Sequence, residues 1–358
     1  MAVRPRLDNR VRAERLRRGW SQEELARRAG LSRAGVSAIE IDRLVPSAAA
    51  ALALAASFAC RVEDLFSLPG TRVSSNAPVW AWEPSRIPCR YWRAEVGGRM
   101  LLFPVEATPM GVVPHDGTAG EASAIVDVGD PTSGRGPRET LVMACCDPAV
   151  GLLAAELEHS AGIRLIALPR SSRAALALLE QGLVHVAGVH LARAGIGNLG
   201  TVREALGSGY VLMRGAQWEE GVAFSGGRRL GSVRAATRAK LRWVGREAGS
   251  GARQCLDELL GHRPPPRRMA NDHRGVAEAV RAGWADAGVC LRLTSEEAGL
   301  GFLSLREEAY DLCVLDASRD DPRIRALLST LRSAPYRRLL GELPGYDSRE
   351  TGEIQNVI

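Results

Sequence analysis

The sequence predicts a multidomain protein in which an all-α domain of five helices precedes a small β module and an α/β domain. Three observations support this fold class. Two short helices with matching cap residues occupy residues 21–40, extended segments follow to about residue 128, and strands alternate with helices from residue 139 onward. A chain of 358 residues is long enough for two or three domains of roughly 100–200 residues each.

Composition narrows the class of protein. Hydrophobic residues make up 46% of the chain and charged residues 25%, which is typical of a packed fold. No apolar run reaches the ~18 residues of a membrane helix, and the arginine-rich start lacks the apolar core of a signal peptide. The seven cysteines form no C-x-x-C pair, so we expect them to be reduced. We therefore expect a cytoplasmic protein with no membrane partner.

The first domain begins with a helix over Asp8–Arg18 and contains two helices joined by a tight turn. Ser21 and Glu24 fit a capping box, Gly30 ends that helix, and Ser32 caps the next one. Helices over Ser47–Ala59 and Val62–Phe66 complete the five. Helical spacing predicts an inward set (Val11, Leu16, Leu25, Ala26, Ala29, Val36, Ile39) and an outward set (Arg10, Arg12, Arg15, Arg17, Arg18, Arg33, Ala34, Ser37, Glu40).

The S-Q-x-x-L-A-x-x-A-G-L-S-x-x-x-V-S-x-I-E pattern of residues 21–40 resembles the helix-turn-helix of the XRE (Cro/cI-type) repressor family. The resemblance implies a homodimer that places the second helix in the major groove of double-stranded DNA. Residues 1–66 carry twelve arginines against eight acids, which suits phosphate contact. A protein-binding or degenerate motif is the alternative. The DNA-binding residues implied are Ser21, Gln22, Ser32, Arg33, Ala34, Ser37 and Arg43, with Arg33 suited to guanine.

Residues 69–138 are expected to form a linker and a small β module. Turn formers predict linkers over 67–84 and 129–137. Between them, residues 89–105 alternate as a hairpin does, with Gly97-Gly98 at its turn. The module is too small for a large core of its own, so we expect Trp80, Trp82 and Trp92 to pack it onto a neighbour.

From residue 139 the pattern indicates a parallel sheet. Strands over 140–144, 163–168 and 185–190 alternate with helices over 149–159 and 171–181. Two short strands, 302–305 and 310–315, precede the final helices. Ligands of such sheets lie beyond the carboxyl ends of the strands.

A second resemblance rests on three motifs, G-S-G-x-R at 249–253, D-H-x-x-V-A-x-A-V-x-x-G-x-A-D-A-G at 272–288, and E-x-Y-D-L at 308–312. They resemble the substrate-binding-protein-like domain that is fused to helix-turn-helix regulators and is similar to periplasmic proteins for molybdate and tungstate. The resemblance implies a two-lobed type II periplasmic-binding-protein-like fold over 139–347. The expected domains are thus 1–68, 69–138 and 139–347, followed by a tail over 348–358.

This resemblance implies a cleft between the lobes, lined by helix N-termini that bind an oxyanion such as molybdate or tungstate. Serines before helices are also ordinary caps, Arg253 also fits a surface ion pair, and His273 also fits a cap or a core residue. For the Cys145-Cys146 pair we favour a buried structural role over a redox or soft-metal role. At Ala252 the relatives often have threonine, and at Cys146 they often have histidine or another polar residue. A group softer than a tetrahedral oxyanion, or a larger ligand, is therefore the alternative. The expected ligand-binding residues are Cys146, Asp147, Ser171, Ser172, Ser250, Gly251, Arg253, His273 and Tyr310.

Together these features predict a ligand-responsive, one-component transcription regulator that binds DNA as a homodimer. The sequence predicts no catalytic set, no metal site and no cofactor beyond the small effector. A molybdenum-cofactor-related enzyme or cofactor-binding protein with an accessory DNA-binding domain is the alternative, although Asp272-His273 lacks a nucleophile beside it. A third reading is a DNA-tethered interaction protein that has lost its ligand.

Overall fold

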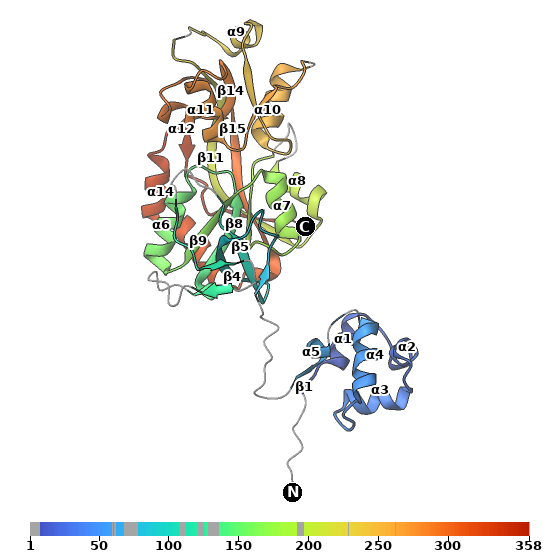
Figure 1. Ribbon diagram of the computed structural model, residues 1–358. Helices are drawn as coiled ribbons and strands as arrows, with labels where there is room; N and C mark the ends of the chain where they lie inside the picture. The colour runs from blue at the N-terminus through green and yellow to red at the C-terminus, as the bar shows by residue number, and fades with distance from the viewer. Residues whose placement is uncertain are drawn as a thin grey trace. The chain divides into compact units, whose positions relative to one another are not determined.

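The computed structural model describes residues 8–58, 60, 62–67, 78–106, 112–120, 125–127, 136–191, 197–227, 229–261 and 263–357. The chain divides into two compact units, Met1–Val79 and Trp80–Ile358 (Figure 1). The linkers predicted over 67–84 and 129–137 lie largely outside the described residues. Within the described part, no helix combines the length and the apolar character needed to cross a membrane.

The first unit is the predicted bundle of five helices, closed by a short antiparallel pairing of β1 (Asp8–Asn9) with β2 (Phe66–Ser67). Its core includes Leu25, Val36, Ile39 and Leu54, each at most 2% exposed. The helices are α1 (Val11–Arg17), α2 (Gln22–Ala29), α3 (Arg33–Glu40), α4 (Ala48–Phe58) and α5 (Val62–Leu65).

The cap residues of α2 and α3 lie where the sequence predicts them. Ser21 Oγ accepts from the Glu24 amide at 3.1 Å, and Ser32 Oγ accepts from the Gly35 amide at 3.0 Å. Gly30 ends α2 with φ of +64°, which a glycine adopts without steric cost. The capping box is only half formed, because the Glu24 carboxylate turns to Arg27 and Arg28.

Three outward or inward assignments in this unit are wrong. Arg15 is 8% exposed and Glu40 is 9% exposed, whereas Leu16 is 58% exposed. Arg15 binds Glu40 through two contacts, Nε to Oε1 at 2.6 Å and Nη2 to Oε2 at 3.0 Å. Helical spacing placed Arg15 and Glu40 on the surface, because a pair of residues 25 positions apart leaves no local pattern in the sequence. In the structure this buried ion pair connects α1 to α3.

The second unit is built on one mixed sheet in the order β13-β12-β14-β11-β15-β10-β8-β9. Two antiparallel strands at its middle, β11 (Tyr210–Phe224) and β15 (Gly301–Leu315), each run for 15 residues. We expected β15 as two short strands and assigned no strand over β11. Figure 1 shows the other strands and the helices gathered around opposite ends of this pair, which defines two lobes.

The first lobe contains the predicted βαβαβ unit, in which β8 pairs in parallel with both β9 and β10. Strands β16 and β17 add to its sheet by pairing with β11. Its elements are β8 (Thr140–Cys145), α6 (Val150–Ala161), β9 (Arg164–Pro169), α7 (Ser172–Glu180), β10 (Val186–Val189), α8 (Asn198–Leu206), α13 (Pro322–Arg332), α14 (Ala334–Gly341), β16 (Tyr346–Asp347) and β17 (Ile354–Val357).

The second lobe covers the other ends of β11 and β15, and β12 pairs in parallel with β13 and β14. Its elements are α9 (Val233–Arg238), β12 (Trp243–Arg246), α10 (Gly251–Leu260), β13 (Arg268–Ala270), α11 (His273–Arg281), β14 (Ala287–Leu291) and α12 (Arg292–Glu297). Between the lobes, the pairing of β11 with β15 shifts register at Arg214/Ala216 and at Glu220/Gly221. Such bulges bend a strand pair locally.

A β module of five strands, ordered β3-β5-β4-β6-β7, packs on the first lobe. Gly97 and Gly98 both have positive φ at the predicted hairpin turn. Trp82 and Trp92 enter the hydrophobic cluster of the first lobe, as predicted, whereas Trp80 stays in the cluster of the module. The strands are β3 (Val79–Trp80), β4 (Cys89–Val96), β5 (Arg99–Pro104), β6 (Gly117–Ala119) and β7 (Ile125–Asp127).

Candidate functional site

The first candidate surface is the exposed side of α3. Ser32, Arg33 and Ala34 are exposed and Ser37 is half-buried, while Val36 and Ile39 are buried on the opposite side. The helix is therefore held by its apolar face and presents its N-terminal residues outward. A basic side chain at this place can reach a guanine edge in a groove.

The residues predicted for phosphate contact surround this helix. Ser21 and Arg43 are exposed. Gln22 is half-buried, and its Nε2 donates to Glu40 Oε2 at 2.8 Å. The side chain of Gln22 therefore belongs to the buried ion-pair network, which leaves the N-terminal amides of α2 as the group placed for an anion.

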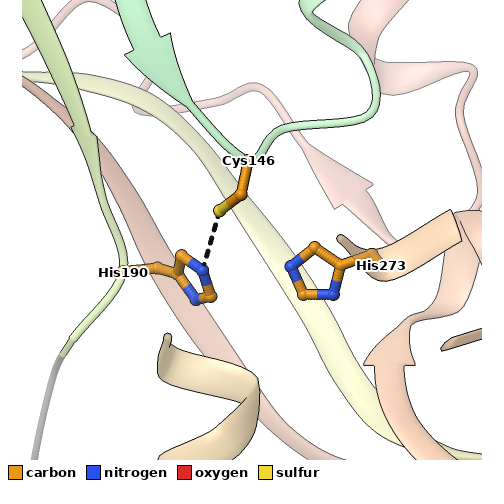
Figure 2. A group of neighbouring side chains, drawn as sticks. All are labelled: Cys146, His190 and His273. Carbon is orange, nitrogen blue, oxygen red and sulfur yellow. Dashed lines mark hydrogen bonds between the residues drawn. The ribbon is translucent and has the colours of Figure 1, made fainter. Parts of the chain in front are cut away.

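The second candidate site is a buried polar centre where the two lobes meet. Cys146 follows β8 and His190 follows β10, both in the first lobe, while His273 opens α11 in the second lobe. Figure 2 shows the three side chains pointing toward one another. Each is at most 8% exposed, and their nearest ligand atoms all lie within 4.8 Å of one another.

His190 is held between two partners. Its Nε2 lies 3.0 Å from Cys146 Sγ (Figure 2). Its Nδ1 lies 3.3 Å from Glu308 Oε2. Burial opposes the charged form, but the neighbouring Cys146 and Glu308 groups outweigh it and raise the pKa of His190 well above its ordinary value. The Glu308 contact favours a proton on Nδ1.

His273 has a different environment. Neither of its ring nitrogens has a hydrogen-bond partner among the described residues, although its side chain is 1% exposed. Burial, together with the nearby charges of Arg246 and His190, lowers its pKa well below the ordinary value. His273 is therefore a neutral imidazole, and leaving such a buried polar group unpaired costs about 1–3 kcal/mol.

Charged groups surround the three residues. Arg246, at the end of β12, is fully buried and binds Glu247 through two contacts of 2.9 Å, while its Nη1 has no partner within the described structure. Arg306 contacts Glu220 at 3.2 Å and Glu308 at 2.5 Å. Burial raises the pKa of Glu220 to about 7, and the nearby Glu308 adds to this effect.

Aromatic rings form one wall of the centre. Trp218 stacks on Tyr310 with ring centroids 4.4 Å apart and meets His190 edge-on at 5.1 Å. Tyr346 donates to Asp147 Oδ1 at 2.7 Å. Burial raises the pKa of Asp147. These contacts fix Asp147 and Tyr310 as buried parts of the first lobe.

The predicted helix N-termini also lie at this junction. Ser172 Oγ accepts from the His190 amide at 3.1 Å, and the neighbouring Ser171 is the buried N-cap of α7. Ser250 caps α10 by accepting from the Arg253 amide at 3.2 Å. Gly251 lies so close to His190 that a β-carbon there would stand 2.7 Å from its Cε1.

Arg253 lies at the edge of the centre, where its Nη1 donates to the backbone carbonyl of the buried Arg246 at 3.4 Å. Its Nε binds Asp257 at 2.8 Å one helical turn along α10, which is the ion-pair alternative that the sequence left open.

Five residues of the centre were missed by the sequence analysis: His190, Trp218, Arg246, Glu220 and Glu308. His190 and Arg246 stand at carboxyl ends of strands, which is the signal that could have found them.

Comparisons with known proteins agree with this division. A family model described as the PBP superfamily domain matches residues 154–332, half of the chain, and one described as helix-turn-helix matches residues 11–65. Two solved structures align with 57% of this chain. They are a putative phosphate substrate-binding protein of Clostridium perfringens (TM-score 0.48, 10% identity, 99% of its length) and a tungstate transporter protein of Geobacter sulfurreducens (0.44, 15%, 97%).

Curated relatives match parts of the chain. An uncharacterized HTH-type transcriptional regulator of Bacillus subtilis, YgzD, is 40% identical over 62 residues, which are 17% of this chain and 94% of YgzD. The uncharacterized protein YvgK of the same organism is 35% identical over 124 residues, 33% of this chain. The chain spans 40% of the length of YvgK.

Proposed function

Because the chain belongs to the PBP superfamily and carries a helix-turn-helix domain, we propose that it is a ligand-responsive regulator that binds operator DNA. One observation carries the proposal. The same chain contains α3, whose N-terminal residues are exposed on a helical bundle, and a buried polar centre between two lobes. Helices of this kind read the major groove, and two-lobed domains bind small ligands where the lobes meet.

In the first unit, we propose that Arg33 makes a bidentate contact with guanine and that Ser32, Ala34 and Ser37 complete the reading of the bases. Exposure of Ser32, Arg33 and Ala34 supports the assignment, and the half-buried Ser37 lies on the same helix. Ser21, Gln22 and Arg43 would contact phosphates, through backbone amides in the case of Gln22. Two copies of the unit in a homodimer would read half-sites about one helical turn apart.

In the second unit, the proposed effector is an oxyanion of the molybdate or tungstate type. Three features support it. The N-termini of α7 and α10 meet at the junction, the hydroxyl of Ser172 can donate to an anion, and Arg246 Nη1 is a buried cationic donor with no partner in the described chain. Charge-assisted bonds from arginine suit tetrahedral anions.

We further propose that the effector acts by changing how the two lobes meet, and so the spacing of two DNA-binding units. A ligand shifts such an equilibrium only by its differential affinity for the two arrangements. The register shifts of β11 and β15 lie where the lobes join, which supports bending at that place.

The test has two parts. Selection from randomised duplexes identifies an operator, and fluorescence anisotropy then measures its affinity with and without molybdate, tungstate or sulfate. Isothermal titration measures the binding of each anion to the full chain. We expect sequence-specific binding that one anion changes by about 5–150-fold. Failure to enrich any duplex would refute the regulator, and absence of heat with all three anions would refute the oxyanion.

A further inference from the structure

We propose that Cys146, His190 and His273 form a binding site for a divalent transition-metal ion of the zinc class. The proposal rests on the proposed function only in placing effector binding at the junction of the lobes. One thiolate and two imidazoles are the donors that such ions prefer, and three protein ligands are typical of a site that keeps one position open. The three donors come from both lobes, so the ion would link them.

The distances fit a site that tightens on binding. Tetrahedral zinc with ordinary bond lengths places its donor atoms about 3.3–3.7 Å apart. Cys146 Sγ and His190 Nε2 are 3.0 Å apart, and all three donor atoms lie within 4.8 Å of one another (Figure 2). Movements of about 1 Å, within reach of side-chain rotation, therefore complete the geometry.

The orientation of His190 is the second observation. Metal-binding histidines commonly donate their other ring N–H to a carboxylate, which fixes the ring and strengthens the metal bond. Glu308 Oε2 lies 3.3 Å from His190 Nδ1, and both side chains are at most 3% exposed. This places Glu308 as the positioning residue behind the proposed ligand.

His273 gives a third, independent observation. Its two ring nitrogens have no hydrogen-bond partner in the part of the chain that the structure describes, and its ring lies 5.5 Å from that of His190 between centroids. Buried polar groups are almost always satisfied, so an orphaned imidazole that faces a thiol and a second imidazole needs a ligand. A metal ion supplies a partner to all three side chains at once.

Charged groups of both signs surround the three donors, namely the carboxyl groups of Asp147, Glu220 and Glu308 and the guanidinium groups of Arg246 and Arg306. The open fourth position can take water or an oxygen of the proposed oxyanion, so the metal and the anion can be bound together.

The test uses the full chain, stripped of metal, and titrates it with Co²⁺ as a spectroscopic substitute for zinc. We expect one ion per chain, with a sulfur-to-cobalt charge-transfer band and the strong visible bands of a tetrahedral site. Zinc should displace the cobalt and abolish both features. Absence of the charge-transfer band, or a stoichiometry unrelated to one ion per chain, would overturn the proposal.

Variants assign the ligands. Cys146→Ser should remove the charge-transfer band, and His273→Gln should lower the cobalt affinity at least 100-fold while the band survives at saturation. Glu308→Gln should weaken binding by about 10–100-fold with the band unchanged. Cys89→Ser, which removes a half-buried thiol from the β module, is the matched control and should bind cobalt as the unaltered chain does. A band that survives Cys146→Ser contradicts the site.

DNA binding separates this inference from the proposed function. The bundle that carries Arg33 lies in the other unit, so the metal-site variants should still bind operator DNA without zinc. If zinc does not bind but an oxyanion changes the DNA affinity, the metal site is wrong and the regulator stands. If zinc binds at Cys146 but no duplex is enriched, the metal site stands and the regulator is wrong.

Discussion

The buried ion pair of Arg15 and Glu40 in the first unit gives a testable prediction. Whether the loss of Glu40 weakens or strengthens DNA binding depends on whether its side chain faces the core or the DNA. Replacement of Glu40 by alanine leaves Arg15, whose side chain is 10% exposed, without its bidentate partner. It also removes the acceptor for Gln22 Nε2 at 2.8 Å. Arg15 keeps only the bond of its Nη1 to the Trp20 carbonyl at 2.7 Å among the contacts described.

Breaking one partner of a buried ion pair costs about 3–5 kcal/mol, because the remaining charge stays buried without compensation. A bundle of about 60 residues has a total stability of roughly 3–9 kcal/mol at the usual 0.05–0.15 kcal/mol per residue. Glu40→Ala should therefore unfold a large part of the bundle at 25 °C and abolish DNA binding, although Glu40 does not reach the exposed side of α3.

The assay is urea unfolding of the full chain. The near-ultraviolet signal of Trp20, which stacks on Phe58 in this unit, is separated from those of the other six tryptophans by subtracting the signal of a Trp20→Phe chain. Glu24→Ala is the matched control. Its pairs with Arg27 and Arg28 lie on the surface, where solvent screens the charges, so its removal should leave the urea midpoint nearly unchanged. If Glu40 instead faced DNA, its removal would strengthen DNA binding and leave stability unchanged, and that result would refute our reasoning.

Three further predictions follow from individual residues. Arg33→Ala should cost about 1–3 kcal/mol of operator binding and relax specificity at one base pair, as measured by anisotropy with matched and mismatched duplexes. Gly251→Ala places a β-carbon against His190, so closure of the lobes should weaken by about 1–3 kcal/mol, seen as a 5–150-fold loss of effector affinity in isothermal titration. Gly151→Ala, where nothing lies within 4 Å of the added carbon, should leave that affinity unchanged. Burial, helped by the charge of Arg323, lowers the pKa of His185 in the folded chain to about 4. Between pH 6.5, the ordinary pKa of histidine, and pH 4, this side chain therefore binds a proton in the unfolded chain but not in the folded one. Stability is then full above about pH 6.5 and falls by about 3 kcal/mol as the pH drops to 4. In a His185→Gln chain, the free energy of unfolding measured with urea should depend less on pH over that range. An unchanged pH dependence would contradict the assignment.

The local signals of the sequence predicted much of this fold because they act over a few residues. Ser21, Gly30 and Ser32 mark helix ends through bonds to their own neighbours. Gly97 and Gly98 supply the positive φ that a two-residue hairpin requires. The βαβαβ unit was equally readable, since buried parallel strands are continuous apolar runs.

The long strands at the middle of the sheet escaped prediction for the opposite reason. Glu220 in β11 and Glu308 in β15 interrupt the apolar pattern at the point where the strands cross between the lobes. The same residues contribute to the polar centre. Sequence analysis therefore divided β15 into two short strands, assigned no strand over β11 and missed part of the site. The pairing of Arg15 with Glu40 escaped because it joins distant parts of the chain.

The place of β17 has a consequence for biosynthesis. Residues Ile354–Val357 pair with Tyr210–Met213 at the start of β11, so the edge of that strand gains its neighbour only when the ribosome has reached residue 357. The bundle over residues 8–67 contains all of its own partners and can fold some 290 residues earlier. Chains that stall in between would therefore carry a finished helix-turn-helix bundle on an incomplete sheet.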